Sequence, residues 1–196
     1  RVADHGEVFT SEREVNAMLD LVNSETQRID SRFLEPACGS GNFLIEVLRR
    51  KLSIVEERYG KGQLEFERNA IVALGSVYGV DLLEDNVAEC RDRLFSYFDE
   101  VYMMLFGDAC REECRKTATY VLERNIICGD ALTMKTAGIE PEPIVFSEWS
   151  PVNGNLVKRR DYSLAHLLVY QPMDGPSLVS DLGEEAFIPK PVRDFP

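Results

Sequence analysis

The chain contains 196 residues, of which 44% are hydrophobic and 29% are charged; this length and balance suit one folded domain with a sizeable core. Its 22 basic and 34 acidic residues give a net charge of −12, which argues against tight nucleic-acid binding by the chain alone because such binding usually needs a basic patch. No apolar stretch approaches the roughly eighteen residues of a membrane span, and no signal-peptide segment follows Arg1. We therefore expect a cytoplasmic protein without membrane contact.

The first predicted helix begins after Ser11 and ends near Asn23. Ser11 and Glu14 have the spacing of a capping box. Apolar residues recur on one face of this helix: Val15, Met18, Leu19 and Val22. Thr10 precedes this helix, and a helix start alone explains the segment well.

The most informative stretch predicts a strand, a tight turn and a helix, a unit that binds nucleotide-like ligands. Two apolar residues end in the carboxylate of Glu35, a turn with Gly39 and Gly41 follows, and a helical pattern extends over Phe43–Glu57. The glycines lack a Cβ atom, so the backbone can adopt a positive φ and approach a ligand closely. No Lys-Ser/Thr pair and no third glycine follow, which argues against a phosphate loop and a dinucleotide fingerprint. Glu35 would repel a phosphate and attract an amino or sulfonium group.

A loop at Tyr59–Gly62 and a helix at Leu64–Leu74 lead to the next predicted strand, Val77–Leu82. An acidic residue that closes the second parallel strand can accept hydrogen bonds from ribose hydroxyls. Asp81 occupies this position, 46 residues after Glu35 (81 − 35), and the additional helix accounts for the long spacing. The alternative is that Asp81 belongs only to the cap of the following helix.

Two further helices are predicted at about 84–105 and 109–123, and the aromatic residues of the first are most simply core. The third strand, Asn125–Cys128, is followed by Gly-Asp-Ala-Leu at 129–132, in which Gly-Asp alone is only a turn signal. A fourth strand is expected at Pro143–Glu148.

A hairpin is predicted beyond the fourth strand, because Asn153-Gly154 is a strong two-residue turn signal between extended segments. In this interpretation the basic cluster Lys158-Arg159-Arg160 lies on the return strand, either solvated or facing nucleic acid. Prolines in the remaining residues oppose helices and central strands, which predicts an irregular tail.

Five cysteines, at positions 38, 90, 110, 114 and 128, include no Cys-x-x-Cys pair. The spacing of Cys110 and Cys114 suits half a metal site, but reduced thiols of a cytosolic protein are the simpler interpretation. His5 and His166 are isolated. The sequence thus supports neither a metal site nor a nucleophilic triad.

Residues 35–43, Glu-Pro-Ala-Cys-Gly-Ser-Gly-Asn-Phe, resemble motif I of S-adenosylmethionine-dependent methyltransferases. More narrowly, they resemble enzymes that methylate the amino group of adenine in DNA, including modification subunits of restriction systems. Residues 6–10 resemble the segment that precedes motif I, and residues 129–132 resemble the third cofactor motif. The resemblance implies S-adenosyl-L-methionine as cofactor and these cofactor-binding residues: Thr10, Glu35, Pro36, Ala37, Gly39, Gly41, Asn42, Phe43, Asp81, Leu82, Asp130 and Ala131.

The resemblance also implies individual roles. In the family, the residue matching Thr10 contacts the methionine carboxylate of the cofactor, and the residue matching Asp81 binds its ribose. The next apolar residue, here Leu82, packs on the adenine. The residue matching Asp130 accepts from the adenine amino group, and the backbone N–H matching Ala131 meets a ring nitrogen.

The catalytic motif of the family, [Asp/Asn/Ser]-Pro-Pro-[Tyr/Phe], follows the fourth strand, and its aromatic residue stacks on the extruded base. Ser150 and Pro151 match the first two positions, whereas Val152 and Asn153 replace the second proline and the aromatic residue. The hairpin signal favours a strand end here over a catalytic loop. The catalytic motif is therefore degenerate or absent from these residues.

These observations predict an α/β fold of the Rossmann-like methyltransferase type: a mostly parallel sheet with helices on both faces, a C-terminal β-hairpin and a Pro-rich tail. We expect residues 1–150 to form the S-adenosylmethionine-binding domain and residues 151–196 the return strand and irregular tail. The resemblance implies methylation of adenine N6 in DNA within a restriction-modification system, with DNA held by another domain or a specificity subunit. Two alternatives remain: a non-catalytic or truncated cofactor-binding subunit, and a methyltransferase for protein glutamine or RNA.

Overall fold

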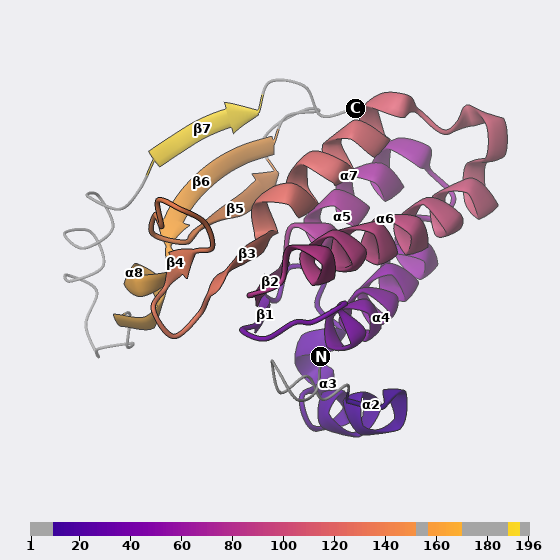
Figure 1. The fold of residues 1–196 in the computed structure, drawn as a ribbon. Helices are drawn as coiled ribbons and strands as arrows, with labels where there is room; N and C mark the ends of the chain where they lie inside the picture. The colour runs from indigo at the N-terminus through magenta and orange to yellow at the C-terminus, as the bar shows by residue number, and fades with distance from the viewer. Residues whose placement is uncertain (1–9, 152–156, 170–187, 193–196) are drawn as a thin grey trace, which may run out of the picture.

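The computed structural model describes residues 10–151, 157–169 and 188–192 (Figure 1). The strands of its main sheet are β1 Phe33–Glu35, β2 Val77–Asp81, β3 Ile126–Asp130 and β4 Lys135–Thr136. They lie in the order β1-β2-β3-β4; the first three are parallel, and β4 runs antiparallel to β3. The predicted α/β class with a mostly parallel sheet is confirmed.

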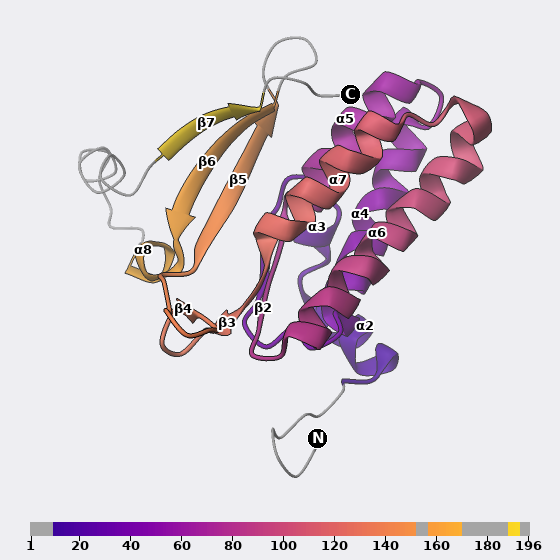
Figure 2. The same ribbon diagram turned by 45° about the horizontal axis from the view of Figure 1, so that its top comes forward.

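Long helices connect the parallel strands and gather on one side of the sheet (Figures 1 and 2). They are α4 Asn42–Tyr59, α5 Gln63–Leu74, α6 Glu84–Phe106 and α7 Glu112–Asn125, with the 3-10 turn η1 Gly107–Ala109 before α7. Connections between parallel strands share one handedness. When the strands lie side by side in chain order, the connecting helices therefore fall on the same face of the sheet. Among the described helices, none combines the length and apolarity needed to cross a membrane.

A second, antiparallel sheet covers the other face of the parallel strands (Figure 2). It consists of β5 Val145–Pro151, β6 Val157–Ser163 and β7 Ile188–Val192, and the short helix α8 Leu164–Val169 follows β6. β5 and β6 pair from Val145–Ser163 to Pro151–Val157, which confirms the hairpin; its Asn-Gly turn lies outside the described residues. β7, within the segment expected to be irregular, pairs with β6 as an edge strand, a position that tolerates proline.

β2 is buried on both faces, as is usual for strands of parallel sheets. Val77 belongs to the large core beneath the helices, whereas Tyr78 and Val80 pack on the hairpin side. Their neighbours there are Ile144, Phe146 and Leu164. The Tyr78 hydroxyl donates to the carbonyl of Ser147 at 3.2 Å and thereby ties β5 to the parallel sheet.

The strand expected at Pro143–Glu148 forms as β5 and lies outside the parallel sheet. β5 pairs with β6 instead of β1–β3 and crosses the sheet toward the amino ends of the parallel strands. There the Trp149 indole packs against Gly75, just before β2, and its N–H donates to Oδ1 of Asn125 at 3.4 Å. The hairpin pairing explains this position, because β6 gives the backbone groups of β5 a nearby antiparallel partner.

The N-terminal helices α2 Glu12–Leu21 and α3 Asn23–Thr26 pack on α4. The predicted capping box is confirmed: the Ser11 hydroxyl accepts from the Glu14 N–H, and the Glu14 carboxylate accepts from the Ser11 N–H. Val15 and Leu19 are buried. Two other residues of the expected apolar face remain exposed: Met18 and Val22.

Lys51 on α4 fixes the connection that leads into β1. Its buried ammonium group donates to the carbonyl oxygens of Arg28, Ile29 and Ser31 at 2.9, 3.0 and 2.5 Å. Burial lowers the pKa of Lys51 to about 7, while three carbonyl acceptors favour its charged form. This contact holds the start of β1 against the helix that follows it.

Candidate functional site

Three carboxylates lie at the same edge of the parallel sheet. Glu35, Asp81 and Asp130 are the last residues of β1, β2 and β3, which are neighbouring strands. Open α/β sheets bind ligands at this edge, and the carboxylates favour a ligand with positive charge. Within the described part of the chain, no group of three His, Cys, Asp or Glu residues could hold a metal ion.

Two glycines with positive φ shape the turn between β1 and α4. The φ angles are +51° at Gly39 and +87° at Gly41, a region that other residues adopt only at an energetic cost. A Cβ atom on Gly41 would lie 2.6 Å from Sγ of Cys90 on α6. On the other side, the Cys38 N–H donates to the Val80 carbonyl at 2.9 Å. The turn is therefore fixed between β2 and α6.

Asp81 organises the turn through three hydrogen bonds. Its Oδ2 accepts from the Gly39 N–H at 2.9 Å, and its Oδ1 accepts from the Leu83 N–H at 2.9 Å and from Nδ2 of Asn86 at 3.1 Å. A carboxylate offers about four lone-pair positions, so Oδ2 retains one for a ligand hydroxyl. The predicted ribose role and the alternative role at the start of α6 are thus compatible in one side chain.

Glu35 is half-buried, and this burial raises the pKa of its carboxyl group, while the hydrogen bond from the Ala37 N–H at 3.3 Å opposes the rise. A carboxylate that has lost part of its hydration gains more from a cationic ligand than an exposed one does. Pro36 and Ala37 are exposed, and Phe43 packs partly buried against the core.

The loops after β2 and β3 carry the residues expected to meet the adenine. Leu82 is 62% exposed and presents apolar surface beside Asp81. Asp130 is bound within its own loop: Oδ1 accepts from the Leu132 N–H at 2.8 Å and Oδ2 from the Thr133 hydroxyl at 3.1 Å. Ala131 packs against the hairpin-side cluster. The adenine-binding roles of these residues remain predictions.

Thr10 lies close to the turn through Asn42, the first residue of α4. Nδ2 of Asn42 donates to the Thr10 carbonyl at 3.5 Å, and Oδ1 of Asn42 accepts from Nη1 of Arg93 at 2.8 Å. Nη1 of Arg93 also donates to the Ser40 carbonyl at 2.7 Å and to the Ser40 hydroxyl at 3.2 Å. The turn, the start of α4 and the N-terminal segment are thus connected.

Ser150 and Pro151 lie at the opposite end of the sheet from the three carboxylates. They line a small cavity of about 180 Å³ together with Arg32, Gly75 and Ser76, which precede β1 and β2. Both belong to β5, where Ser150 pairs with Lys158 and Pro151 with Val157. The structure does not bring these two residues to the candidate cofactor site, and their catalytic assignment stays a prediction.

The basic cluster on β6 is not uniformly solvated, contrary to our expectation. Arg159 is buried; it donates to the Tyr120 hydroxyl at 2.6 Å and to Oδ2 of Asp161 at 2.8 Å. Side chains alternate along a strand, so Arg159 faces the interior while Lys158 and Arg160 face the other side of the sheet. Arg159 is therefore a packing residue and offers no charge to DNA.

The five cysteines are free thiols. Cys114 is buried, and burial raises its pKa to about 12. Cys110 donates to the Tyr102 carbonyl at 3.3 Å. Cys90 packs beneath Gly41. Burial, a hydrogen bond and close packing thus account for Cys114, Cys110 and Cys90, respectively.

Sequence reasoning missed two residues that support the turn: Arg93 and Asn86. Arg93 is separated from Ser40 by 53 positions (93 − 40) and belongs to no recognised motif. Asn86 stands five residues after Asp81 (86 − 81), in the first turn of α6; an amide there is a detectable, though common, signal of a polar contact near a helix start.

Residues 15–105 match a family model described as "RMKL-like, methyltransferase domain". The match spans β1 through most of α6 and includes Glu35 and Asp81, whereas Thr10 and Asp130 lie outside it. Neither the curated proteins nor the solved structures yielded a match to this chain. The matched segment and the fold support a methyltransferase domain, a class that generally uses S-adenosylmethionine, and leave its methyl acceptor open.

Proposed function

We propose that the chain binds S-adenosylmethionine at the carboxyl ends of β1–β3 and serves an enzyme that methylates N6 of adenine in DNA, in a restriction-modification system. One observation carries the cofactor assignment: three neighbouring parallel strands each end in a carboxylate, beside a turn held in shape by two glycines with positive φ. The choice of adenine rests on the resemblance of residues 35–43 and 129–132 to enzymes with that acceptor.

The residues present fit this cofactor. Glu35 suits the ammonium group of its methionine portion, because the carboxylate is half-buried and close to the turn. Asp81 keeps a lone pair for a ribose hydroxyl. Leu82 offers an exposed apolar side chain to the adenine ring. A Cβ atom on Gly41 would clash with Sγ of Cys90 on α6, so the glycine lets the turn pack closely on that helix.

When bound, S-adenosylmethionine supplies an electrophilic methyl group that leaves a neutral thioether after transfer to a nucleophilic nitrogen. The protein's part is to orient both partners and to stabilise charge at fixed positions. The three carboxylates give the site a negative potential that complements a sulfonium cation. The same charge opposes a phosphate backbone, so we expect DNA to be held by another domain or subunit.

A second candidate is a cofactor-binding module that relies on another segment or subunit for the acceptor site. The position of Ser150 and Pro151 favours it, since these residues lie at the end of the sheet remote from Glu35 and Asp81. In this case the chain binds S-adenosylmethionine but transfers no methyl group alone.

Isothermal titration with S-adenosylmethionine tests the cofactor site. We expect the folded wild-type chain to bind, and Glu35→Gln and Asp81→Asn to bind at least about tenfold more weakly, because each loses a charge-assisted contact. A wild-type chain that is folded and does not bind would refute the assignment. Transfer of a labelled methyl group to DNA, RNA or a glutamine-containing peptide then identifies the acceptor. Binding without transfer to any of the three supports the cofactor-binding module.

A further inference from the structure

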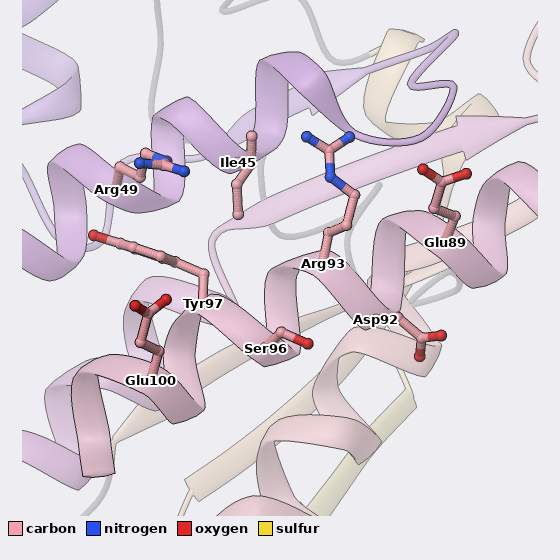
Figure 3. Close-up of a pocket in the computed structure, with 8 residues that line it drawn as sticks. All are labelled: Ile45, Arg49, Glu89, Asp92, Arg93, Ser96, Tyr97 and Glu100. Carbon is pink, nitrogen blue, oxygen red and sulfur yellow. The ribbon is translucent and has the colours of Figure 1, made fainter. Parts of the chain in front are cut away.

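Arg93 lies next to the turn between β1 and α4 and lines an open groove between α4 and α6 (Figure 3). The groove has a volume of about 490 Å³, and its lining includes Arg49 of α4 and Arg93 and Tyr97 of α6. In Figure 3 the side chain of Arg93 extends from α6 toward α4. Arg49, also on the groove, contacts Glu46 at 3.2 Å and the ring of Tyr97 instead.

Within the described residues, the hydrogen bonds of Arg93 all go to the end of the turn and the first residue of α4. Its Nη1 donates to the Ser40 carbonyl, the Ser40 hydroxyl and Oδ1 of Asn42, at 2.7, 3.2 and 2.8 Å. Within the described residues, Arg93 forms no ion pair with a carboxylate. The guanidinium charge of Arg93 therefore lies against the turn, and no salt bridge in the described part of the chain neutralises it.

This arrangement also fixes the orientation of the Asn42 amide. An amide has one oxygen acceptor and one nitrogen donor, and a guanidinium group has only donors. Because Oδ1 of Asn42 faces Arg93, Nδ2 faces the Thr10 carbonyl, at 3.5 Å. Arg93 thus acts on Thr10 through a single intervening side chain.

We propose that Arg93 is a positioning residue for the amino-acid end of the cofactor, acting through Asn42 on the segment that carries Thr10. This inference rests on the proposed function. The charge of Arg93 adds to the positive N-terminal end of α4, and both favour a ligand carboxylate beside the turn. The adenosine end is expected at Asp81 and Asp130, whereas the hydrogen bonds of Arg93 go to Ser40 and Asn42, so we expect the effect to be confined to the amino-acid end.

Three ligands separate this role from a general structural one. S-adenosylmethionine and S-adenosylhomocysteine carry the amino-acid end, whereas 5′-methylthioadenosine lacks it. We expect Arg93→Gln to weaken binding of the first two by about tenfold and to leave binding of the third unchanged. Arg93→Lys should recover part of the loss because it restores the charge. Arg49→Gln, an equivalent change on the same groove, should leave all three affinities unchanged.

Asn42→Ala provides a second variant, because it breaks the connection to Thr10 while Arg93 keeps its bonds to Ser40. We expect the same selective loss for the two ligands with an amino-acid end. Equal loss of all three ligands in both variants, or no loss in either, would overturn the inference. A wild-type chain that binds 5′-methylthioadenosine alone would also overturn it, and one that binds none of the three would refute the proposed function itself.

Discussion

The substitution Gly41→Ala tests how tightly the turn packs between β2 and α6, through its effect on the free energy of unfolding. Gly41→Ala forces an L-residue to keep a φ of +87°, which costs about 1–2 kcal/mol. The new Cβ atom would also lie 2.6 Å from Sγ of Cys90, and overpacking of this kind costs about 1–3 kcal/mol. We therefore expect the free energy of unfolding to fall by about 2–5 kcal/mol.

Cys90→Ala separates the two contributions, because it removes Sγ and leaves the backbone strain in place. In urea unfolding followed by circular dichroism, the double variant should be more stable than the sum of the single changes predicts, with a coupling energy of about 1–3 kcal/mol. Single changes that add to within about 0.5 kcal/mol would show that Cys90 does not restrict Gly41. The reasoning on the turn would then be wrong.

Four further predictions concern the charged residues Glu35, Lys51 and Arg159. Burial raises the pKa of Glu35, so affinity for S-adenosylmethionine should weaken as pH falls through that raised pKa, whereas Glu35→Gln should show no such dependence in a titration series. The Glu35 carboxyl group binds its proton more tightly in the folded state than in the unfolded chain. Its contribution to the free energy of unfolding is therefore lost as the pH rises through the raised pKa. In urea unfolding, Glu35→Gln should remove this dependence of the unfolding free energy on pH. Lys51→Met leaves three carbonyls without their donor and should lower the unfolding free energy by about 2–4 kcal/mol; an unchanged urea midpoint would contradict this. Arg159→Met removes the buried guanidinium group that pairs with Asp161, which keeps the hydrogen bond from the Ser147 hydroxyl, and should cost about 3–5 kcal/mol. Lys158→Met, on the other side of β6, should change the thermal midpoint little.

The sequence predicted the parts of the site that depend on neighbouring residues. The strand, turn and helix around Gly39 and Gly41 are local, since glycine spacing and hydrophobic periodicity act over a few positions. The end of β2 followed from the same patterns to within one residue, at Asp81. The third strand was expected to end at Cys128, and it extends two residues farther, to Asp130. The α/β class then followed from the alternation of strands and helices.

Features that depend on contacts between distant residues were not predictable from the sequence. Arg93 reaches Ser40 across two helices and a strand, and nothing in its neighbourhood distinguishes it from other helical arginines. The hairpin of β5 and β6 was predicted from its turn signal, but its position across the parallel sheet was not, because period and composition do not fix what a strand packs against. The burial of Arg159 likewise depends on which face of β6 meets α7, a matter of tertiary packing.

Trp149 has a practical consequence for solution experiments. It is the single tryptophan of the chain, and it lies against Gly75, Asn125 and the ring of Tyr120, at the end of the sheet away from Glu35 and Asp81. Its intrinsic fluorescence therefore reports whether the hairpin remains docked on the helical layer. Loading of the ligand site should leave the emission spectrum nearly unchanged, while detachment of β5 should shift it to longer wavelength as the indole meets water.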